Sequence, residues 1–466
     1  MTEATCSHER SHIVDSRFFG DRYSTEVSRR TFCDACRARR WLTVEAELAL
    51  AEADLGLIPP EAARRIAQAA QAGQLDLDAV KAETNRSGHS LVGLLRVFQA
   101  ACGADAGQYI HYGATTQDIQ DTAQVLEMRD VMDALEDLLR ENAGYLLRIA
   151  EENAEVPALG RTHAQPALPM TFGLKVAGWL DEALRHLERM AQMRERVLVV
   201  QLFGGAGTMA AFGPAAPELL RRFGERLGLG VPAIGWHVAR DRIAEFVTLL
   251  AMIAGASGRA ADEIRVLSRP EFGEVSEAWA YGKVGSSTMP HKRNPERCEQ
   301  VVVTARMAAA QAQLAMTALA GDHERDSRSL RLEWACVADV SHYTLASAQI
   351  FGEIISGLEV HPDRLWANVS AVADRIASES LMFALAQRHG KQTAHEMVYR
   401  LTQTAQEKRV SVLEFVREQG EADLSLDAAT LDDIFDPCRY LGASAKLTRQ
   451  VVDEARAVLG LTTMPR

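Results

Sequence analysis

Helical periodicity dominates the pattern of hydrophobic and polar positions along this chain. Apolar residues recur every three or four positions over stretches much longer than the ~11–12 residues of an average globular helix. Strand-like alternation is nearly absent. The pattern therefore predicts a mainly α fold with a central bundle of long helices, the longest of them over Thr116–Asn153, Pro169–Gln201, Arg240–Leu267, Glu296–Ala320 and Arg331–Gly357.

Breaks in this pattern divide the chain into parts. A Gly-Leu-Ile-Pro-Pro break ends a first helix, and the next helix begins after Pro60. Past about His361 the predicted helices become short. Because domains typically run about 50–250 residues, we predict an N-terminal helical domain (1–113), a central long-helix domain (114–360) and a small C-terminal helical domain (361–466).

One predicted helix, Ala305–Gly321, is apolar nearly all round. A helix of this kind must be buried on every side. Contact with other subunits would supply that burial, so we expect the bundle to form an oligomer.

Composition and charge narrow the function. The 466 residues are 47% apolar, enough for a large core, and they carry a net charge of −12. This charge argues against a nucleic-acid-binding surface, which needs clustered Lys and Arg. An acidic protein can still bind an anionic metabolite through local cations, and the clusters to consider are His291–Arg293 and His323–Arg331.

The N-terminus and the cysteines favour a cytoplasmic protein. The chain opens without an apolar signal segment, and its longest apolar runs, such as Phe246–Ala256, are shorter than a membrane span. Seven scattered cysteines are typical of a reducing compartment. Cys33 and Cys36 form a CxxC without a second pair, so ordinary thiols are favoured over a metal site built from Cys6, His8 and His12.

Three polar, glycine-bearing segments lie at the ends of long helices. The first, "QYIHYGATTQDIQDTA" (Gln108–Ala123), offers hydroxyls and free N–H groups to an anion, although an ordinary N-cap by Thr115 or Thr116 is favoured on this stretch alone. The second, "GRTHAQPALP" (Gly160–Pro169), holds a histidine without a metal partner. The third, "GSSTMPHKRNP" (Gly285–Pro295), has serines and cations that suit a carboxylate or phosphate. Loops on a rigid scaffold concentrate function, so we expect the three to converge.

Together and in this order, "GATTQD", "GRTHAQPA" and "GSSTMPHKRNP" resemble the three motifs of the fumarase/aspartase superfamily. The resemblance extends from "RRWLTVEAELALAEADLGLIP" to the C-terminal "AHEMVYR" and "DPCRYLG". It implies a three-domain fold, a homotetramer, and active sites where the motifs of three subunits meet. It also implies anti β-elimination from a succinyl compound with release of fumarate, and neither a metal nor an organic cofactor.

The resemblance assigns proton abstraction to the third motif. Removing a proton next to a carboxylate creates an aci-carboxylate, whose charge needs positioned donors. By the motif match Ser286 is the general base, backbone N–H groups near Ser286 and Ser287 supply donors, and Lys292 and Asn294 contact the carboxylate. A serine is a weak base unless its pKa is depressed, so the loop must close over the substrate.

The same resemblance assigns the other motifs to the remaining parts of the substrate. Thr115 and Thr116 match the hydroxyl pair that binds the carboxylate of the fumarate half. His163 matches the histidine that protonates the leaving group in several members. A leaving group that departs without a proton would leave His163 without that role.

Further segments resemble two branches of the superfamily. Matches to adenylosuccinate lyase occur at "DRYS", "SGHSLVGLLR", "HYGATT" and "HERD", which imply substrate contacts by Arg22, His89, His111 and Arg325. The alternative for His89 is a histidine at a helix N-terminus without a role. Matches to 3-carboxy-cis,cis-muconate cycloisomerase occur at "WHVARDRIAEF" and "LEW".

Two substitutions speak against a nucleotide substrate. Adenylosuccinate lyases place a serine and an arginine after "HERD" to hold a phosphate, and this chain has Leu330 and Trp334 there. A lost contact to a bound anion costs ~1.5–3 kcal/mol. Arg328 or Arg331 could substitute only from a shifted register, so a compact dicarboxylate or tricarboxylate is favoured.

The resulting hypothesis is a lyase that cleaves a C–N bond of a substituted succinate, with an amine, an amide-like nitrogen or the nitrite of nitrosuccinate as leaving group. The alternatives are cycloisomerisation of 3-carboxy-cis,cis-muconate and adenylosuccinate cleavage itself. A non-catalytic scaffold is disfavoured, because none of the core motif residues is missing. Expected partners are a small carboxylate and other copies of the chain, with neither nucleic acid nor membrane.

Overall fold

The structure is a computed structural model that describes residues 11–72, 75–279, 281–282, 284–419, 424 and 426–461. It is mainly helical, as the periodicity predicts. The chain divides into two compact units, each built from three separate stretches. Unit 1 contains residues 1–139, 186–259 and 300–350, and unit 2 contains residues 140–185, 260–299 and 351–466. The division into three domains stays a prediction.

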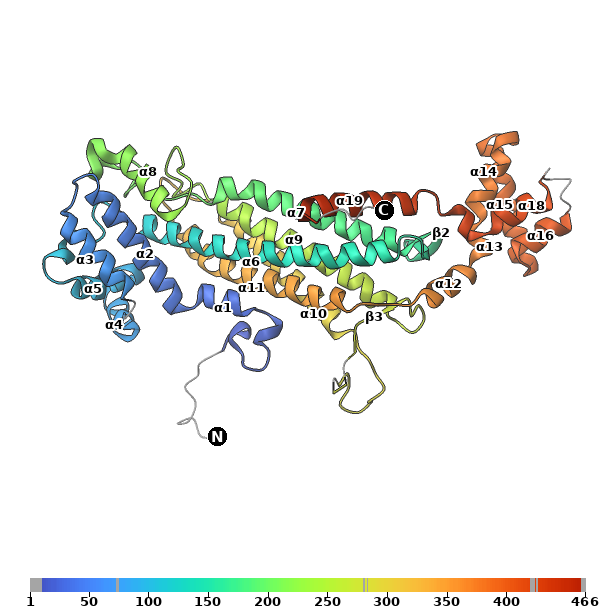
Figure 1. Ribbon diagram of the computed structural model, residues 1–466, viewed down its shortest axis with the longest axis horizontal. Helices are drawn as coiled ribbons and strands as arrows, with labels where there is room; N and C mark the ends of the chain where they lie inside the picture. Colours follow the sequence, from blue (N-terminus) through green and yellow to red (C-terminus); the bar gives the residue numbers. More distant parts are fainter. Residues whose placement is uncertain are drawn as a thin grey trace. The chain divides into compact units, whose positions relative to one another are not determined.

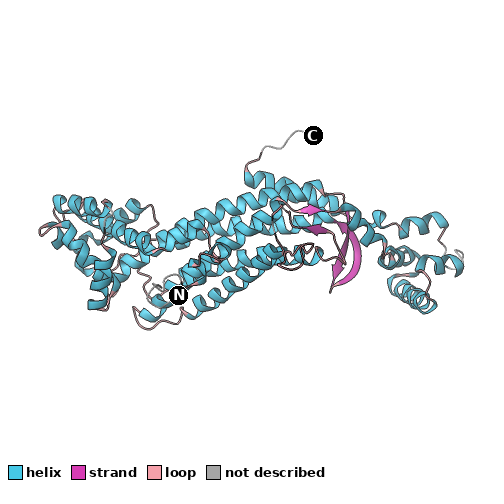
Figure 2. Ribbon diagram, turned by 90° about the horizontal axis from the view of Figure 1, so that it is seen from below, coloured by secondary structure: helices cyan, strands magenta, loops and turns pink. Residues whose placement is uncertain are grey.

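Five long helices supply the scaffold: α6 (Thr116–Glu152), α7 (Phe172–Val197), α9 (Asp241–Leu267), α10 (Glu296–Thr317) and α11 (Ser327–Ser356). Their segments run side by side within each unit (Figures 1 and 2). The periodicity located all five to within about four residues at each end.

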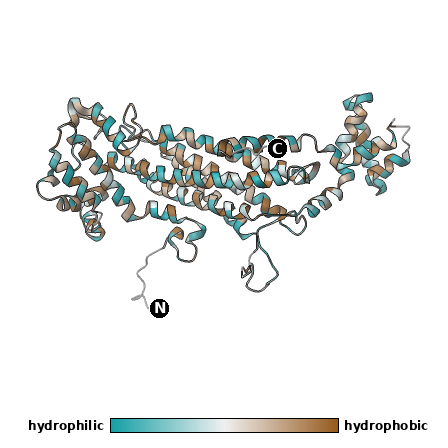
Figure 3. Ribbon diagram, viewed as in Figure 1, coloured by the Kyte–Doolittle hydropathy of each residue, from teal (hydrophilic) through white to brown (hydrophobic). Residues whose placement is uncertain are grey.

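Two of these helices carry many apolar side chains, which are buried to different extents. Among the described helices, α9 has the length and apolar composition of a membrane span, but 61% of its most apolar window is buried, as in a core helix. Along α10 and the turn after it, Val303, Leu314, Met316 and Leu319 are 40–55% exposed. The single chain thus does not bury this helix on every side, and its burial by other subunits stays a prediction. Figure 3 shows apolar and polar positions mixed along the helices.

The described residues before α6 form a group of helices in unit 1, several of which have clear start signals. Thr25 and Ser28 form a reciprocal capping box, Pro60 occupies the first turn of its helix, and Asp76 accepts N–H groups of the next. The helices are α1 (Glu26–Phe32), α2 (Asp34–Ala53), α3 (Pro60–Gln71), α4 (Leu77–Ser87) and α5 (Ser90–Cys102), with α8 (Ala216–Leu227) later in the chain.

Unit 2 contains a β-hairpin that the sequence pattern missed. Strand β1 (Pro157–Thr162) pairs antiparallel with β2 (Gln165–Thr171). Its prolines and glycine obscure the alternation that marks a strand. A second, two-residue pairing joins β3 (Val275–Ser276) to β4 (Glu359–Val360).

The C-terminal part of unit 2 consists of short helices, as predicted. Leu381, Leu385, Phe415, Val416 and Leu431 belong to a buried core that α14, α15, α16 and α18 share. The helices are α12 (Pro362–Ser370), α13 (Ala373–Ile376), α14 (Ser378–His389), α15 (Lys391–Lys408), α16 (Val412–Gln419), α18 (Ala428–Phe435) and α19 (Ser444–Leu459).

Candidate active site

The first motif lies at the N-terminus of α6 in unit 1, where a buried carboxylate fixes the chain. Asp118 is fully buried and accepts the N–H groups of Thr115 (3.0 Å), Phe203 (3.0 Å) and Gly204 (2.9 Å). His237 Nε2 lies 2.9 Å from the same carboxylate. Asp118 therefore fastens the motif to two other segments, a role that the sequence did not reveal.

Arg325 of the "HERD" segment lies against this motif. Its Nη1 donates to Thr115 Oγ1 at 2.7 Å, and longer contacts of 3.4 Å reach Gly205 O and Gln117 Oε1. Thr116 is half-buried at the first residue of α6. The structure thus brings together two predicted substrate contacts, Arg325 and Thr115, at the positive end of a 37-residue helix.

His111, just before the motif, is held by a buried glutamate. Glu45 of α2 is 1% exposed and accepts both the His111 N–H (3.0 Å) and a hydrogen bond from Nδ1 (2.7 Å). Although burial by itself disfavours the imidazolium, the hydrogen bond and charge of Glu45, with a contribution from Asp118, raise the His111 pKa. Glu45 and Glu52 share a buried face of α2, and a helical wheel of the sequence could have shown that.

A buried ion network lies deeper in unit 1. Arg240 pairs with Asp121 (2.8 Å) on α6 and with Glu333 on α11, and all three side chains are at most 1% exposed. The guanidinium also lies 4.9 Å from the Trp236 ring. Burial disfavours the charged form, but Asp121 and Glu333 more than offset it and raise the Arg240 pKa. The "WHVARD" and "LEW" segments, noted for their resemblance, therefore form part of the scaffold.

Two predicted substrate contacts occupy the N-terminal region of unit 1. His89 is exposed at the N-cap of α5, where its Nδ1 accepts the Val92 N–H at 3.4 Å. This hydrogen bond gives His89 a place at the N-terminus of a helix, which is the alternative to a substrate contact. The substrate contact of His89 stays a prediction. Arg22 is exposed, and its carbonyl oxygen accepts a hydrogen bond from Gln300 at 2.9 Å.

Apolar side chains occupy the two positions that the resemblance to adenylosuccinate lyase predicts for phosphate binding. Leu330 is 7% exposed, and Trp334 lines a cavity of about 240 Å³. Arg328 is bound to Asp322 (2.6 Å) and Asp326 (2.5 Å). It is therefore neutralised locally rather than free to replace a phosphate-binding arginine.

The second motif forms the tip of the β1–β2 hairpin in unit 2. His163 and Ala164 form the two-residue turn and both have positive φ, 51° and 62°. Such a turn normally selects Asn or Gly, because other residues are strained there. His163 is exposed at this tip. Residues with strained backbone conformations cluster at functional sites, so the φ of His163 agrees with its predicted role.

The third motif is the loop before α10. Ser286 is half-buried, and its Oγ accepts the N–H groups of Thr288 (3.3 Å) and Met289 (3.0 Å). Ser287 and Lys292 are exposed. Two N–H donors on the serine oxygen favour its deprotonated form, because they stabilise negative charge.

Internal contacts close this loop. Asn294 Nδ2 donates to Gly285 O at 2.6 Å, and the Lys292 N–H donates to Met289 O at 3.0 Å. A Cβ at Gly285 would lie 2.2 Å from Lys292 O. Glycine is thus required where the two ends of the loop meet, and the Asn294 amide is engaged in holding them.

The predicted site residues belong to both units. Arg22, His89, His111, Thr115, Thr116 and Arg325 lie in unit 1, and His163, Ser286, Ser287, Lys292 and Asn294 lie in unit 2. The structure is that of a single chain, so convergence of motifs from three subunits stays a prediction.

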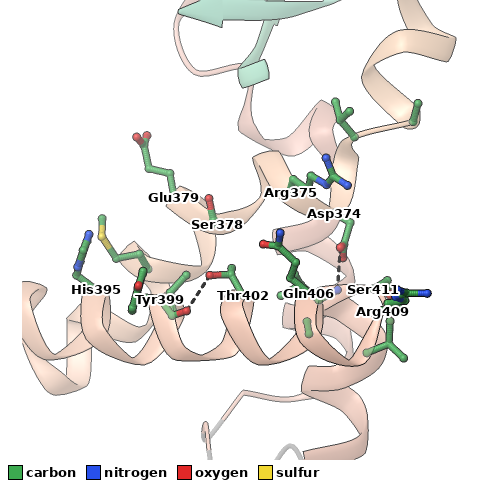
Figure 4. A pocket seen from close by; sticks show the side chains of 17 residues that line it. Asp374, Arg375, Ser378, Glu379, His395, Tyr399, Thr402, Gln406, Arg409 and Ser411 are labelled. Carbon is green, nitrogen blue, oxygen red and sulfur yellow. Dashed lines mark hydrogen bonds between the residues drawn. The ribbon is translucent and has the colours of Figure 1, made fainter. Parts of the chain in front are cut away.

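A cavity of about 1000 Å³ lies elsewhere in unit 2, between α13, α14 and α15 (Figure 4). Asp374 accepts the Val412 and Leu413 N–H groups, and Glu379 accepts the Tyr440 hydroxyl. These carboxylates already have structural roles, and no residue of the three motifs lines the cavity. We therefore place the candidate active site at the three motifs rather than at this cavity.

The described part of the chain contains no group of three His, Cys, Asp or Glu side chains placed to bind a metal. Cys33 and Cys36 are free thiols. Cys6 and His8, of the alternative metal site, lie outside the described residues.

Comparisons with known proteins agree with this organisation. Residues 20–313 match a family described as "Lyase", and residues 374–451 match "Adenylosuccinate lyase C-terminus". The chain is 38% identical to the N-acetyl-S-(2-succino)cysteine lyase of Dickeya dadantii, over 95% of this chain and 97% of that one. The chain belongs to the fumarase/aspartase superfamily.

Other members of the superfamily are similar over nearly the full length. The adenylosuccinate lyase of Pyrococcus abyssi is 36% identical, over 93% of this chain and 96% of that one. The crystal structure of 3-carboxy-cis,cis-muconate lactonizing enzyme from Pseudomonas putida superposes with a TM-score of 0.87 at 31% identity, covering 95% and 100% of the two chains. The chain is thus a superfamily lyase, while the predicted C–N specificity stays a prediction.

Proposed function

We propose that this chain catalyses anti β-elimination from a 2-substituted succinate and releases fumarate, with Ser286 as general base. The contact between Arg325 and Thr115 carries the proposal. It places a guanidinium, a hydroxyl and the N-terminus of α6 at one point, which is a carboxylate-binding arrangement. The family match supplies the reaction class.

The proposed step moves one proton and one electron pair. The Ser286 oxygen takes the proton from the carbon next to a carboxylate, and the resulting aci-carboxylate is stabilised by donors that include Lys292 and loop N–H groups. The electron pair then forms the C=C bond of fumarate while the bond to the leaving atom breaks. That atom departs with its bonding pair and takes up a proton from His163 or water.

The substrate in this proposal carries no nucleotide. Leu330 is buried, Trp334 faces a cavity of about 240 Å³, and Arg328 is paired with two carboxylates. Leu330 and Trp334 offer a phosphate neither charge nor a hydroxyl, and the charge of Arg328 is engaged by Asp322 and Asp326. A compact leaving group fits the observations better.

We propose sulfur as the leaving atom, in an S-(2-succinyl) thioether. Two similar relatives, 38% and 36% identical, are named as lyases of such a compound. The chemistry is also less demanding, because a thiol with a pKa of roughly 8.5 can leave as thiolate, whereas an amine must be protonated first. His163, exposed on a turn, would then be dispensable for bond cleavage.

Nitrogen is the second candidate leaving atom. The 36% identity to an adenylosuccinate lyase and the match of residues 374–451 favour it. Cleavage of that bond would require an acid such as His163, so the effect of His163→Gln separates the two candidates.

We also propose that the chain acts as a homotetramer. The exposed apolar side chains Val303, Leu314, Met316 and Leu319 support an assembly. Monomeric soluble proteins rarely expose large groups of apolar side chains to water. Light scattering of the purified protein tests this point.

The decisive assay presents the purified enzyme with three substrates: an S-(2-succinyl) thioether, an N-(2-succinyl) amine and 3-carboxy-cis,cis-muconate. Fumarate is followed by proton NMR. We expect fumarate from the thioether with wild type and with His163→Gln, and little from Ser286→Ala. Turnover of the muconate without fumarate would instead establish the cycloisomerase reaction. Inertness toward all three would overturn the proposed function.

A further inference from the structure

The contact between Glu45 and His111 joins two segments 66 residues apart. The Glu45 carboxylate is 1% exposed, and each of its oxygens accepts one hydrogen bond from His111: Oε2 from the backbone N–H and Oε1 from Nδ1. The His111 side chain is 20% exposed. One buried anion therefore fixes both the main chain and the ring of a histidine that still reaches solvent.

The main-chain half of this contact supports an unusual backbone. His111 has a φ of 55°, in the left-handed region that few non-glycine residues adopt. Two residues later Gly113 has a φ of 69°, and a Cβ there would lie 2.4 Å from the Phe212 ring. The path of the chain into Thr115 is thus determined on both sides, by Glu45 before the motif and by Phe212 within it.

The hydrogen bond between the His111 ring and Glu45 influences the charge of the ring. The groups that act on His111 are Glu45 of α2 and Asp118 of α6, and both favour the imidazolium against the effect of burial. Glu52, on the same face of α2, has a pKa raised to about 9 by burial and by Glu45, so it is neutral near pH 7. The cation beside the motif is Arg325, bonded to Thr115.

We propose that Glu45 is a positioning residue that holds His111 as an imidazolium, with Nδ1 occupied and Nε2 left to donate to a carboxylate of the substrate. This inference rests on the proposed function. The buried glutamate fixes which ring nitrogen faces the ligand, in the way that a carboxylate fixes a metal-bound or catalytic histidine. A charged donor forms a stronger hydrogen bond to a carboxylate than a neutral one does.

The test measures fumarate affinity against pH by calorimetry, which needs no knowledge of the leaving group. Wild type is compared with Glu45→Gln, with Glu45→Asp, and with Glu47→Gln, a matched change on the same helix at a carboxylate that pairs with Arg226. At about pH 7.5 we expect Glu45→Gln to weaken binding roughly 10- to 100-fold. At about pH 5.5, below the ordinary histidine pKa of roughly 6.5, the difference should fall to within about threefold.

The controls separate positioning from structure. Glu47→Gln should follow the wild-type pH profile, and Glu45→Asp should recover part of the affinity at neutral pH because it restores the charge. A purely structural role predicts that Glu45→Gln lowers affinity equally at all pH values, and that result would overturn the proposal.

A second measurement uses the wild-type enzyme, in case Glu45 variants do not fold. NMR of protein labelled at histidine Cε1, assigned with His111→Gln, reports the pKa of His111. We expect a pKa above the ordinary value, and a pKa at or below that value contradicts the proposal. If wild type fails to bind fumarate at any pH while His111 has a raised pKa, the proposed function fails and the pairing stands.

Discussion

The start of α6 and the loop before α10 are stabilised in opposite ways. Asp118, fully buried at the first, accepts hydrogen bonds from Thr115, Phe203 and Gly204 and contacts His237, so it joins three segments. Ser286, half-buried in the second, accepts two N–H groups from its own loop. One region is part of the core of its unit, and the other is organised by neighbours in sequence.

This difference matches the tasks proposed for the two regions. A carboxylate clamp is most effective when its donors are fixed before the substrate arrives. A loop that carries a base must admit the substrate first and then hold it, which requires local rather than global stability. Substitutions should therefore separate activity from stability, according to the region they affect.

The largest expected effect is on activity, from Ser286→Ala in the loop. Loss of the general base should lower kcat/KM by roughly 10²- to 10⁴-fold. The denaturation midpoint should not change, because the serine bonds only within its loop among the described residues. Steady-state kinetics and thermal unfolding measure the two quantities, with exposed Ser370→Ala as control. A large fall in the midpoint would show that the loop belongs to the core.

The largest expected effect on stability comes from Arg240→Leu behind the α6 region. It leaves Asp121 and Glu333 buried without their cation, which should lower the free energy of unfolding by about 3–5 kcal/mol. Urea denaturation at fixed protein concentration measures this loss. Arg242→Leu, at the second residue of α9, should change stability by less than about 0.5 kcal/mol. An equal loss of stability in both variants would mean that the buried ion network contributes no more to stability than Arg242 does.

A smaller effect on activity is expected from Gly285→Ala. The added Cβ would lie 2.2 Å from Lys292 O, so the two ends of the loop must separate. A displacement of about 1 Å can cost up to ~10²-fold in rate, and we expect a 10- to 100-fold loss of kcat/KM with an unchanged unfolding midpoint. Gly178→Ala, where the Cβ meets no atom within 4 Å, is the control. Full activity of Gly285→Ala would show that loop closure is not needed.

The smallest expected effect is a change with pH in the free energy of unfolding, caused by a buried histidine of unit 1. His342 is buried, and burial together with nearby His12, Arg29 and Arg37 lowers its pKa to about 4. The unfolded chain, with an ordinary pKa of roughly 6.5, therefore binds the proton more readily. Stability contributed by neutral His342 is complete above about pH 6.5 and is lost as the pH falls toward 4.

We expect this loss to reach about 2–3 kcal/mol near pH 4.5. His342→Gln, which can retain the contact to Ser28 (2.8 Å), should show a shallower decline in the unfolding free energy over that range. The catalytic activity proposed for Ser286 should not follow the titration of His342. Parallel pH curves for wild type and variant would refute the assignment.

The sequence predicted much of this organisation because periodicity and motif order are local properties. The five long helices and the short C-terminal helices were confirmed. The β1–β2 hairpin was missed, because Pro166, Pro169 and Gly160 interrupt its alternation. The expected burial of α10 by other subunits stays a prediction, because Val303, Leu314, Met316 and Leu319 are exposed in the single chain.

The candidate site was predictable where chemistry follows a contiguous motif. Arg325 and Thr115, 210 residues apart, were predicted separately and meet in the structure. The partners that hold the motifs were not predicted: Glu45 resembles any helical glutamate, and Asp118 resembles an ordinary first-turn acid. Their roles arise from tertiary contacts over 66 to 119 residues, which periodicity cannot report.

The reverse reaction in D₂O tests the central claim most directly. Wild-type enzyme, Ser286→Ala and Ser370→Ala are each incubated with fumarate and N-acetylcysteine, and the product is examined by NMR. The account predicts that wild type and Ser370→Ala consume fumarate and form a 2-succinyl thioether with one deuterium, added anti to sulfur, while Ser286→Ala forms almost none. Unchanged fumarate in every sample, with the thiol and also with amines in its place, would contradict the account.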